Sequence, residues 1–260
     1  MSRSVDERDR LPRLFTDLAH LWPLLSPSED YVAEAAAVHR ALVARLAESV
    51  RKAERKPWLL ELGAGGGHTI KHLTDRYDIV AVDLSEQMLV NCRRLNPGVE
   101  AVVGDMRDVR LHRTFEAVLV HDAVDYLESP SDIARLLETS AVHLEAGGVV
   151  LVAPTYVSET FVEHDVEHDH HSDGELDLTY FSYVHRPDTG GRRVEAILVY
   201  LIREGGEVEV VEDRHVGGLF SAAEWLEMLE AAGFDASPDY LITPDEDGGG
   251  GVPMFVGIKR

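Results

Sequence analysis

A glycine-rich turn that directly follows an apolar stretch is the feature that most constrains this chain of 260 residues. The segment Leu59-Leu60-Glu61-Leu62-Gly63-Ala64-Gly65-Gly66-Gly67 runs from a predicted strand into a turn, and a helical segment is predicted over 68–76. Twenty residues after Gly63, the apolar run 79–82 ends in Asp83. Glycines permit a tight turn and close approach of a ligand, and an acid at the next strand end accepts hydrogen bonds from ribose hydroxyls. The sequence therefore predicts a βαβ unit that binds a nucleoside cofactor.

The details of the turn distinguish between two kinds of cofactor. A dinucleotide fingerprint, G-x-G-x-x-G, needs a third glycine at position 68, where this chain has His68. The pattern present is E-x-G-x-G-x-G, which starts at Glu61. A pyrophosphate requires a helix N-terminus with nothing bulky in front of it. His68 therefore disfavours a nicotinamide dinucleotide and a dehydrogenase, whereas S-adenosylmethionine, which carries no phosphate, fits the turn.

Three further motifs follow the glycine turn in order along the chain. They are Val102-Val103-Gly104-Asp105-Met106, the mainly apolar run 115–123, and the segment 144–151 with its Gly147-Gly148 turn. Together the four motifs resemble those of the class I S-adenosylmethionine-dependent methyltransferases. The resemblance implies S-adenosylmethionine as cofactor, S-adenosylhomocysteine as product, and the following cofactor-binding residues: Glu61, Gly63, Gly65, Asp83, Leu84, Asp105, Met106 and His121.

Taken singly, each motif also has a structural interpretation. The glycines could serve only the turn, and Asp83 could cap a helix that is predicted to begin near Ser85. Asp105 could be a turn residue, since the Gly-Asp pair is common between elements. The occurrence of all four motifs in one order favours the cofactor site.

The order of the predicted elements indicates an α/β fold. Helices that begin near His68, Ser85 and Ser131 alternate with strands predicted over 58–62, 79–82, 99–103, 117–121 and 149–153. Such alternation gives a parallel sheet with helices on both faces. The resemblance implies a Rossmann-like seven-stranded methyltransferase sheet, which strands predicted over 240–243 and 254–258 complete. A helix is predicted over 221–232, and a flexible connection over 245–251.

The same pattern predicts how the chain is divided. Helices broken near Pro23 and Pro27 are predicted over 14–46, within an N-terminal helical segment that covers 1–56. The methyltransferase core covers 57–155 and 217–260. Between its two parts lies an antiparallel β insert over 156–216, which the resemblance implies to be a lid over the acceptor. Its predicted strands are 176–184, 193–203 and 207–216.

Charge and cysteine content limit the possible partners and the cellular location. The chain has 25 Lys+Arg and 47 Asp+Glu, a net charge of −22. Such a field repels phosphate backbones and anionic lipids, so we expect no nucleic-acid or membrane partner, although an acidic surface also serves solubility. The only cysteine, Cys92, excludes an internal disulfide. With no signal-like or membrane-spanning apolar run, these features predict a cytoplasmic protein.

Histidines of the insert are the candidates for acceptor chemistry. Methyl transfer from a sulfonium requires alignment of the acceptor lone pair with the methyl group, and a base only if the acceptor must lose a proton. His168, His171 and His215 are the predicted catalytic residues. The run 164–173, interpreted as a loop, could instead be merely solvated or hold a metal ion, but it lacks a diagnostic spacing and no metal ligand is assigned. His215 could also be a packed strand residue.

Along nearly its whole length the chain is similar to the bacterial TDP-amino-sugar N-methyltransferases. The shared segments are Asp17-Leu18-Ala19, 30–35, 104–108 and Phe255-Val256-Gly257. The resemblance implies a lid histidine near the acceptor nitrogen, here His215. The His-rich run and His121-Asp122 depart from that family's pattern and leave the acceptor open.

We therefore predict S-adenosylmethionine-dependent methyl transfer to N or O of a small metabolite by a monomer or homodimer. Two alternatives stay open. One is a metal-assisted methyltransferase that uses the His/Asp loop 164–173. The other is a non-catalytic module that only binds S-adenosylmethionine.

Overall fold

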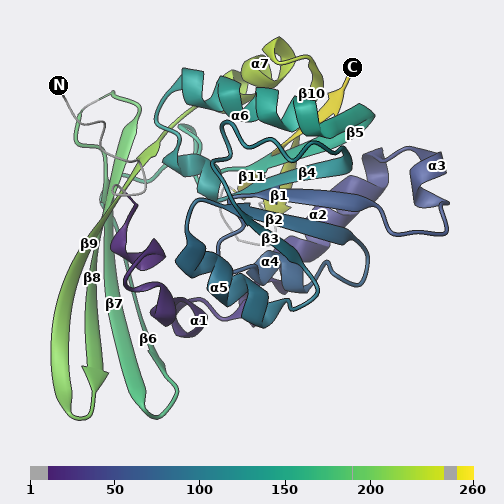
Figure 1. Cartoon of the computed structure of the whole chain (residues 1–260). Coiled ribbons are helices and arrows are strands. Elements are labelled where there is room, and N and C mark those ends of the chain that lie inside the picture. Colours follow the sequence, from purple (N-terminus) through teal and green to yellow (C-terminus); the bar gives the residue numbers. More distant parts are fainter. Residues whose placement is uncertain (1–10, 189, 243–250) are drawn as a thin grey trace, which may run out of the picture.

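The computed structural model describes residues 11–188, 190–242 and 251–260, and two β-sheets organise this part of the chain (Figure 1). Sheet A has the strand order β10-β11-β5-β4-β1-β2-β3, and sheet B has the order β6-β7-β8-β9. The strands of sheet A are β1 (Trp58–Leu62), β2 (Asp78–Asp83), β3 (Glu100–Val103), β4 (Phe115–His121), β5 (Leu144–Ala153), β10 (Phe234–Ile242) and β11 (Val252–Lys259). Strands β1 to β5 are parallel, and β11 runs antiparallel to both of its neighbours. The predicted seven-stranded Rossmann-like α/β sheet is confirmed.

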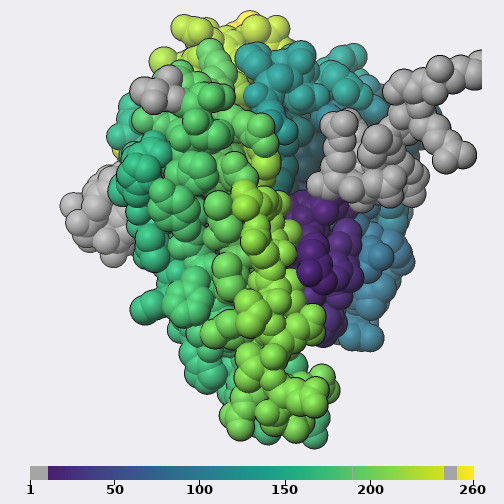
Figure 2. All heavy atoms as spheres, turned by 90° about the vertical axis from the view of Figure 1, so that its left-hand side faces the viewer, coloured from purple at the N-terminus to yellow at the C-terminus, as the bar shows by residue number. Residues whose placement is uncertain are grey.

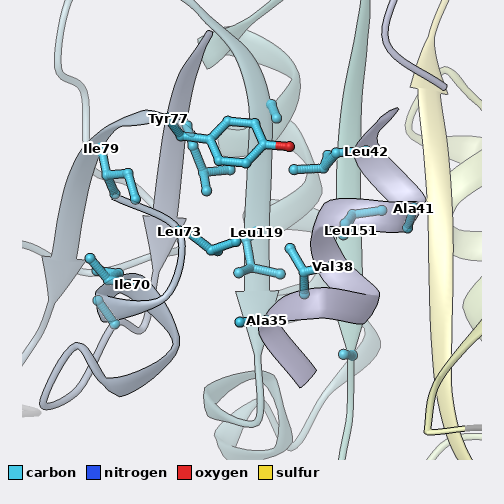
Figure 3. Close-up of a cluster of buried hydrophobic side chains, with 14 of the residues drawn as sticks. Ala35, Val38, Ala41, Leu42, Ile70, Leu73, Tyr77, Ile79, Leu119 and Leu151 are labelled. Atoms are coloured by element: carbon cyan, nitrogen blue, oxygen red, sulfur yellow. The ribbon is translucent and has the colours of Figure 1, made fainter. Parts of the chain in front are cut away.

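Helices cover both faces of sheet A because its central strands are apolar on both sides. Every residue of β4 is buried. One face packs against α2 (Val32–Arg45), and Figure 3 shows Val38 and Leu42 of this helix beside Leu119 and Leu151 of the sheet. The opposite face packs against α6 (Pro130–His143) and α7 (Ala222–Ala231). Shorter elements are α3 (Glu48–Arg51), α4 (His68–Lys71), α5 (Glu86–Leu95) and η5 (Ala123–Tyr126).

Serine caps fix where three of these helices begin. The hydroxyl groups of Ser85, Ser129 and Ser221 accept hydrogen bonds from backbone N–H groups in the first turns of α5, α6 and α7. Such caps satisfy backbone donors that have no partner within the helix. The cap of α5 matters for the site, because Ser85 lies just after the end of β2.

Sheet B is antiparallel and holds the N-terminal segment on one of its faces. Its strands are β6 (Asp165–Ser172), β7 (Leu176–His185), β8 (Arg193–Glu204) and β9 (Glu207–Gly218). Leu178, Tyr200 and Val211 of this face form a buried cluster with Leu14, Leu18 and Leu21. The short elements that make the contact are η2 (Arg13–Phe15), η3 (Ala19–Leu21) and α1 (Trp22–Leu25), and η4 (Ser28–Tyr31), which follows them, packs against α2 and α4 instead. The N-terminal segment therefore lies between the two sheets (Figure 1).

The structure corrects several predicted elements. The interpretation of 164–173 as a loop is wrong, because β6 pairs with β7 from Asp165 to Ser172. Its polar side chains are compatible with a strand since β6 is at the edge of sheet B. The helix predicted over 68–76 is limited to the four residues of α4, and the strand predicted from 240 begins at Phe234. The flexible connection predicted over 245–251 lies outside the described residues, apart from Gly251.

Among the described residues, no helix has the length and apolarity required to cross a membrane.

Candidate functional site

The glycine turn lies at the carboxyl edge of sheet A, where β1, β2 and β4 end together. The N–H groups of Gly63 and Ala64 both donate to the carbonyl oxygen of Val82, at 2.8 and 3.0 Å. The Asp83 carboxylate accepts from the N–H of Gly65 at 2.8 Å and from the N–H of Ser85 at 2.8 Å. Asp83 thus connects the glycine turn to the start of α5. In parallel sheets, ligands bind at such carboxyl ends.

The turn requires glycine because of its backbone conformation and its close neighbours. Gly63 and Gly65 have φ angles of +80° and +51°. A Cβ atom on Gly63 would lie 2.2 Å from the Cβ atom of Ala123 and 3.0 Å from Cε of Met106. The segments after β3 and β4 therefore pack directly against the turn. Two predicted cofactor residues, Gly63 and Met106, are brought together here.

Glu61 is a buried acid without a partner for one of its oxygens. It lies near the end of β1 with 3% of the residue exposed, and its Oε2 atom forms no hydrogen bond. Burial raises the pKa of Glu61 to about 8, and the charges of Asp83 and Asp122 contribute. The ionised form of a buried carboxyl group is costly unless a cation or a hydrogen-bond donor compensates its charge. S-adenosylmethionine has an ammonium group and a sulfonium, and therefore carries the positive charge that could compensate an ionised Glu61.

Asp105 follows β3 and is held by Arg107. The Arg107 guanidinium donates to both carboxylate oxygens, with Nη2 2.6 Å from Oδ2, and the backbone N–H of Arg107 donates to Oδ1 at 2.8 Å. Burial alone would raise the pKa of Asp105, but the hydrogen bonds and charge of Arg107 outweigh it, so the pKa is lowered. Asp105 is therefore an ionised acceptor with a fixed orientation. Leu84, another predicted contact, lies between Asp83 and Ser85 at the end of β2.

His121 ends β4 and lies beside two acids. Its Nε2 atom is 3.2 Å from Oδ1 of Asp122 and 3.5 Å from Oε2 of Glu34, and its Nδ1 atom is 3.4 Å from Oγ1 of Thr69. Asp122 has a φ angle of +51°, which is uncommon for a residue other than glycine. Such strained residues occur at functional sites. The predicted His121 thus lies at the same edge as Glu61, with Glu34 supplied by α2.

Two aromatic residues from the N-terminal segment, Trp22 and Tyr31, lie at this edge. The sequence did not identify Trp22. The Trp22 ring stacks on His68 with ring centroids 6.0 Å apart, and a Cβ atom on Gly66 would lie 2.7 Å from Trp22. Tyr31 contacts both His68 and His121 edge-on. Burial lowers the pKa of His68 to about 4, so its ring is neutral. The signal that could have identified Trp22 is its place directly before Pro23 in a helical segment, but nothing local links it to the glycine turn.

His215 lies on β9, opposite the segment that follows β4. Its Nδ1 atom is 2.7 Å from the hydroxyl oxygen of Tyr126, and its Nε2 atom is 3.1 Å from Oδ2 of Asp213. Phe15 packs edge-on against both rings. Asp213 and Tyr126 were not predicted; the i, i+2 spacing of Asp213 and His215 on one strand face was the available signal. Tyr126 belongs to η5, whose Ala123 packs on the glycine turn, so His215 is connected to the cofactor edge.

Asp125 is a further acid of η5 that the sequence did not single out. Its Oδ2 atom accepts the backbone N–H of Thr155 at 3.0 Å, and burial raises the pKa of Asp125 to about 8. The Thr155 hydroxyl donates to Asp122 at 3.3 Å. Glu61, Asp122 and Asp125 thus give the carboxyl edge of the sheet an excess of acidic groups.

His168 and His171 lie away from this edge. Both belong to β6, three strands from β9, and they point to opposite faces of sheet B. His168 packs on the exposed Phe181, whereas His171 stacks on Tyr180 of the inner face. The structure does not bring either of them together with His215. Within the part of the chain that the structure describes, no group of three or more His, Cys, Asp or Glu residues is arranged to hold a metal ion.

Comparisons with known proteins identify the family of the chain. A family model described as a methyltransferase domain matches residues 59–148. The dTDP-3-amino-3,4,6-trideoxy-alpha-D-glucopyranose N,N-dimethyltransferase of Streptomyces venezuelae is 32% identical over 237 residues, which cover 90% of this chain and 93% of that protein. The dTDP-3-amino-3,6-dideoxy-alpha-D-glucopyranose N,N-dimethyltransferase of Streptomyces fradiae is 29% identical over 232 residues, 83% of this chain and 89% of that protein.

Solved structures show the same similarity. The crystal structure of Streptomyces venezuelae DesVI has a TM-score of 0.78 at 29% identity and covers 99% of this chain and 100% of that chain. The sugar N-methyltransferase KedS8 from Streptoalloteichus has a TM-score of 0.79 at 27% identity, with coverage of 100% and 98%. The chain therefore belongs to the class I S-adenosylmethionine-dependent methyltransferases, in the group similar to TDP-amino-sugar N-methyltransferases, and it transfers methyl groups from S-adenosylmethionine to N or O of a small metabolite.

Proposed function

We propose that the acceptor is the amino nitrogen of a deoxy-amino sugar linked to a nucleoside diphosphate, and that the enzyme adds two methyl groups to it. The observation that carries this proposal is the relative of 32% identity, because it spans almost the whole of both chains and is named for N,N-dimethylation of such a sugar. Two further relatives are named for the same reaction on other dTDP-amino sugars.

Cofactor binding is assigned to the acids and glycines at the carboxyl edge of sheet A. S-adenosylmethionine supplies an electrophilic methyl group on a sulfonium. Glu61, buried and with an unpartnered oxygen, is the acceptor for its ammonium group, and Asp83 is the acceptor for the ribose hydroxyls. Asp105 accepts from the adenine amino group and Met106 covers the ring. The two glycines, Leu84 and His121 supply close contacts around them.

The acceptor side is assigned to His215. Asp213 holds one ring nitrogen and Tyr126 contacts the other, so the imidazole is oriented and can take up a proton at Nδ1 through the tyrosine hydroxyl. An amine must be neutral to attack the methyl group, which gives a base a role when the sugar arrives as an ammonium ion. The amine lone pair forms the new C–N bond as the C–S bond breaks. His168 and His171 receive no role in this step, since they lie three strands away.

The chain division expected from the sequence fits this assignment. Sheet B with the insert 156–216 serves as the lid, because β9 carries His215 to the edge of the core 57–155 and 217–260. The N-terminal segment within 1–56 contributes Trp22 and Tyr31 beside the glycine turn. A cytoplasmic location suits the buried free thiol of Cys92.

The test is a methylation assay with a panel of nucleotide sugars. The protein is incubated with S-adenosylmethionine and dTDP-linked sugars that carry an amino group at C3 or at C4, and with the corresponding hydroxy sugars as controls. Mass spectrometry should detect the gain of one and then two methyl groups on an amino sugar only. Methylation of the hydroxy sugars alone, or of none of the panel by protein that binds the cofactor, would contradict the proposal.

A further inference from the structure

Residues 13–22, here called the bridging segment, connect sheet B with the cofactor edge of sheet A. The segment comprises η2, η3 and the first residue of α1. Figure 2 shows it at the surface, in purple, between the green strands of sheet B and the blue part of the core that includes α5. One end of the segment holds a group next to His215, and the other end lies against the glycine turn.

The first end of the bridging segment holds Asp213. The backbone N–H of Arg13 donates to Oδ1 of Asp213 at 2.9 Å, and the N–H of Leu14 donates to Oδ2 at 2.8 Å. Oδ1 also accepts the backbone N–H of Arg214 at 2.9 Å, and Oδ2 accepts Nε2–H of His215 at 3.1 Å. Only 5% of Asp213 is exposed, so these four N–H groups fix a buried carboxylate, which in turn orients the His215 ring.

The bridging segment also keeps Asp213 ionised. Burial opposes ionisation, but the hydrogen bonds from the His215 ring and from two N–H groups of the segment outweigh it, so the pKa of Asp213 is lowered. An ionised carboxylate accepts Nε2–H, and Nδ1 is then the nitrogen of the His215 ring that takes up a proton.

Phe15 packs against the hydrogen bond that joins the proposed lid to the core. Its ring lies edge-on to both His215 and Tyr126, with centroid distances of 5.4 Å to each. Edge-on aromatic pairs at such distances are attractive. Because His215 and Tyr126 share the 2.7 Å hydrogen bond, the Phe15 ring restricts the rotation of both of its partners.

The remaining contacts hold the bridging segment on the cofactor side. The hydroxyl group of Ser85 donates to the carbonyl oxygen of Phe15 at 2.5 Å, and Nδ2 of Asn91 donates to that of Ala19 at 2.7 Å. Ser85 caps α5 and Asn91 belongs to it. Phe15 also packs edge-on against Trp22 at 6.1 Å, and Trp22 lies against the glycine turn. The backbone of Phe15 is therefore fixed on the cofactor side, while its ring lies on the acceptor side.

We propose that Phe15 is a positioning residue for the base His215, and that the bridging segment fixes the pair of His215 and Tyr126 relative to the bound cofactor. This inference rests on the proposed function, because it concerns the residue to which proton uptake is assigned there. Phe15 acts through the imidazole, since its own side chain neither takes up a proton nor bonds to the acceptor. Orientation matters because misplacement of a catalytic group by about 1 Å can cost about 100-fold in rate.

A double-mutant cycle tests this role, with the dTDP-amino sugar that the methylation panel identifies as the acceptor. Phe15→Ala should lower kcat about 3- to 10-fold, as expected for the loss of edge-on aromatic contacts, and change the S-adenosylmethionine Kd and the acceptor KM by less than about threefold. In the His215→Ala background the same substitution should cause no further loss, because Phe15 acts only through that ring. Phe15→Tyr keeps the ring and should restore kcat.

Leu18→Ala is the matched control for packing. Leu18 belongs to the bridging segment and is buried against sheet B. This variant should therefore unfold at a lower temperature but keep the wild-type kcat well below that temperature. If Phe15→Ala does not fold, Phe15→Leu takes its place, because leucine keeps an apolar side chain without the ring.

A second measurement needs no acceptor. In proton–nitrogen NMR spectra of the histidine rings, the Nε2–H signal of His215 is identified by its absence in His215→Ala. This proton should exchange slowly with solvent in the wild type, because it is held between the ring and the buried Asp213. It should exchange faster in Phe15→Ala and at the wild-type rate in Leu18→Ala.

Two results would overturn the role of Phe15. One is a folded Phe15→Ala protein with wild-type kcat and slow exchange of the His215 proton. The other is a loss in the double variant equal to the product of the two single losses, which would place the effect of Phe15 outside His215. Both can occur while His215→Ala is slow, so the inference can fail without the assigned base. If the panel contained no acceptor, the proposed function would fail, and the NMR spectra would still decide whether Phe15 positions the ring.

Discussion

The hydroxyl group of Tyr126 and the Nδ1 atom of His215 lie 2.7 Å apart, although 89 residues separate them in the chain. Tyr126 belongs to the segment that follows β4, and His215 belongs to the last strand of sheet B. The Nε2 atom of His215 faces Asp213, so Nε2–H donates to the carboxylate and Nδ1 accepts from the tyrosine hydroxyl. This hydrogen bond joins the cofactor edge of sheet A to the proposed lid.

Substitutions of His215 should slow methyl transfer without affecting cofactor binding. We expect kcat to fall about 100-fold in His215→Ala, since general-base groups contribute at least this much, and the S-adenosylmethionine Kd to stay unchanged. Tyr126→Phe should shift the pH profile of kcat, because the hydrogen bond to Nδ1 is lost. Steady-state kinetics and calorimetry measure both effects. His168→Ala is the matched control and should keep full activity; equal losses in the His168 and His215 variants would contradict the assignment.

Glu61→Gln should raise stability and weaken cofactor binding at the same time. The pKa of Glu61 in the folded protein is about 8, above its ordinary value of 4.5, so the folded state binds more protons than the unfolded state between these values. Its ionisable group therefore lowers stability progressively as pH rises from about 4.5 to 8. Removal of this group should increase the free energy of unfolding at pH 7.5 by about 1–3 kcal/mol, while S-adenosylmethionine affinity falls about 10- to 100-fold.

A second buried glutamate provides the control for Glu61. Glu116 lies near the start of β4, at the edge of sheet A opposite to the glycine turn. There it accepts the backbone N–H of Trp58 at 2.7 Å and pairs with Arg55. Glu116→Gln should lower stability and leave cofactor affinity unchanged. Thermal unfolding and calorimetric titration distinguish the two variants. If Glu61→Gln behaved like Glu116→Gln, Glu61 would be a structural residue.

Binding of the cofactor should release a proton near neutral pH. The Glu61 carboxyl group is largely protonated below about pH 8 in the free protein, and a cationic partner favours its ionised form. Affinity should therefore weaken as pH falls from 8 to 6. Titrations in buffers of different ionisation enthalpy give the number of protons released, which should be close to one for the wild type and lower in Glu61→Gln. Affinity that does not vary with pH would exclude this linkage.

Gly63→Ala should disrupt the cofactor turn. The added methyl group would meet Ala123 at 2.2 Å in a backbone with φ of +80°, and we expect a stability cost of about 1–3 kcal/mol with loss of measurable binding. Gly147→Ala is the matched control, because Gly147 has a similar φ of +77° but no atom within 4 Å of the position that an added methyl group would take. The control should lose only the stability that a positive φ costs a residue other than glycine, and it should bind the cofactor normally.

The parts of the molecule that the sequence predicted are those encoded locally. The central strands β1, β2 and β4 of sheet A appear as apolar runs because both of their faces are buried, and the glycines and Asp83 follow from spacing alone. Strand β6 was missed because an edge strand can be formed by polar residues when its backbone pairs with a neighbour. Trp22 and Tyr126 could not be assigned, since their contacts are made between segments distant in the chain.

Calorimetric titration of S-adenosylmethionine into Asp83→Ala and Asp78→Ala tests the central claim most directly. Both acids belong to β2, but Asp83 ends the strand at the glycine turn and Asp78 begins it at the opposite end. The assignment predicts that binding is lost or weakened at least about tenfold in Asp83→Ala and preserved in Asp78→Ala, with both variants folded by circular dichroism. Unchanged affinity in Asp83→Ala would show that the cofactor does not bind at this edge of the sheet.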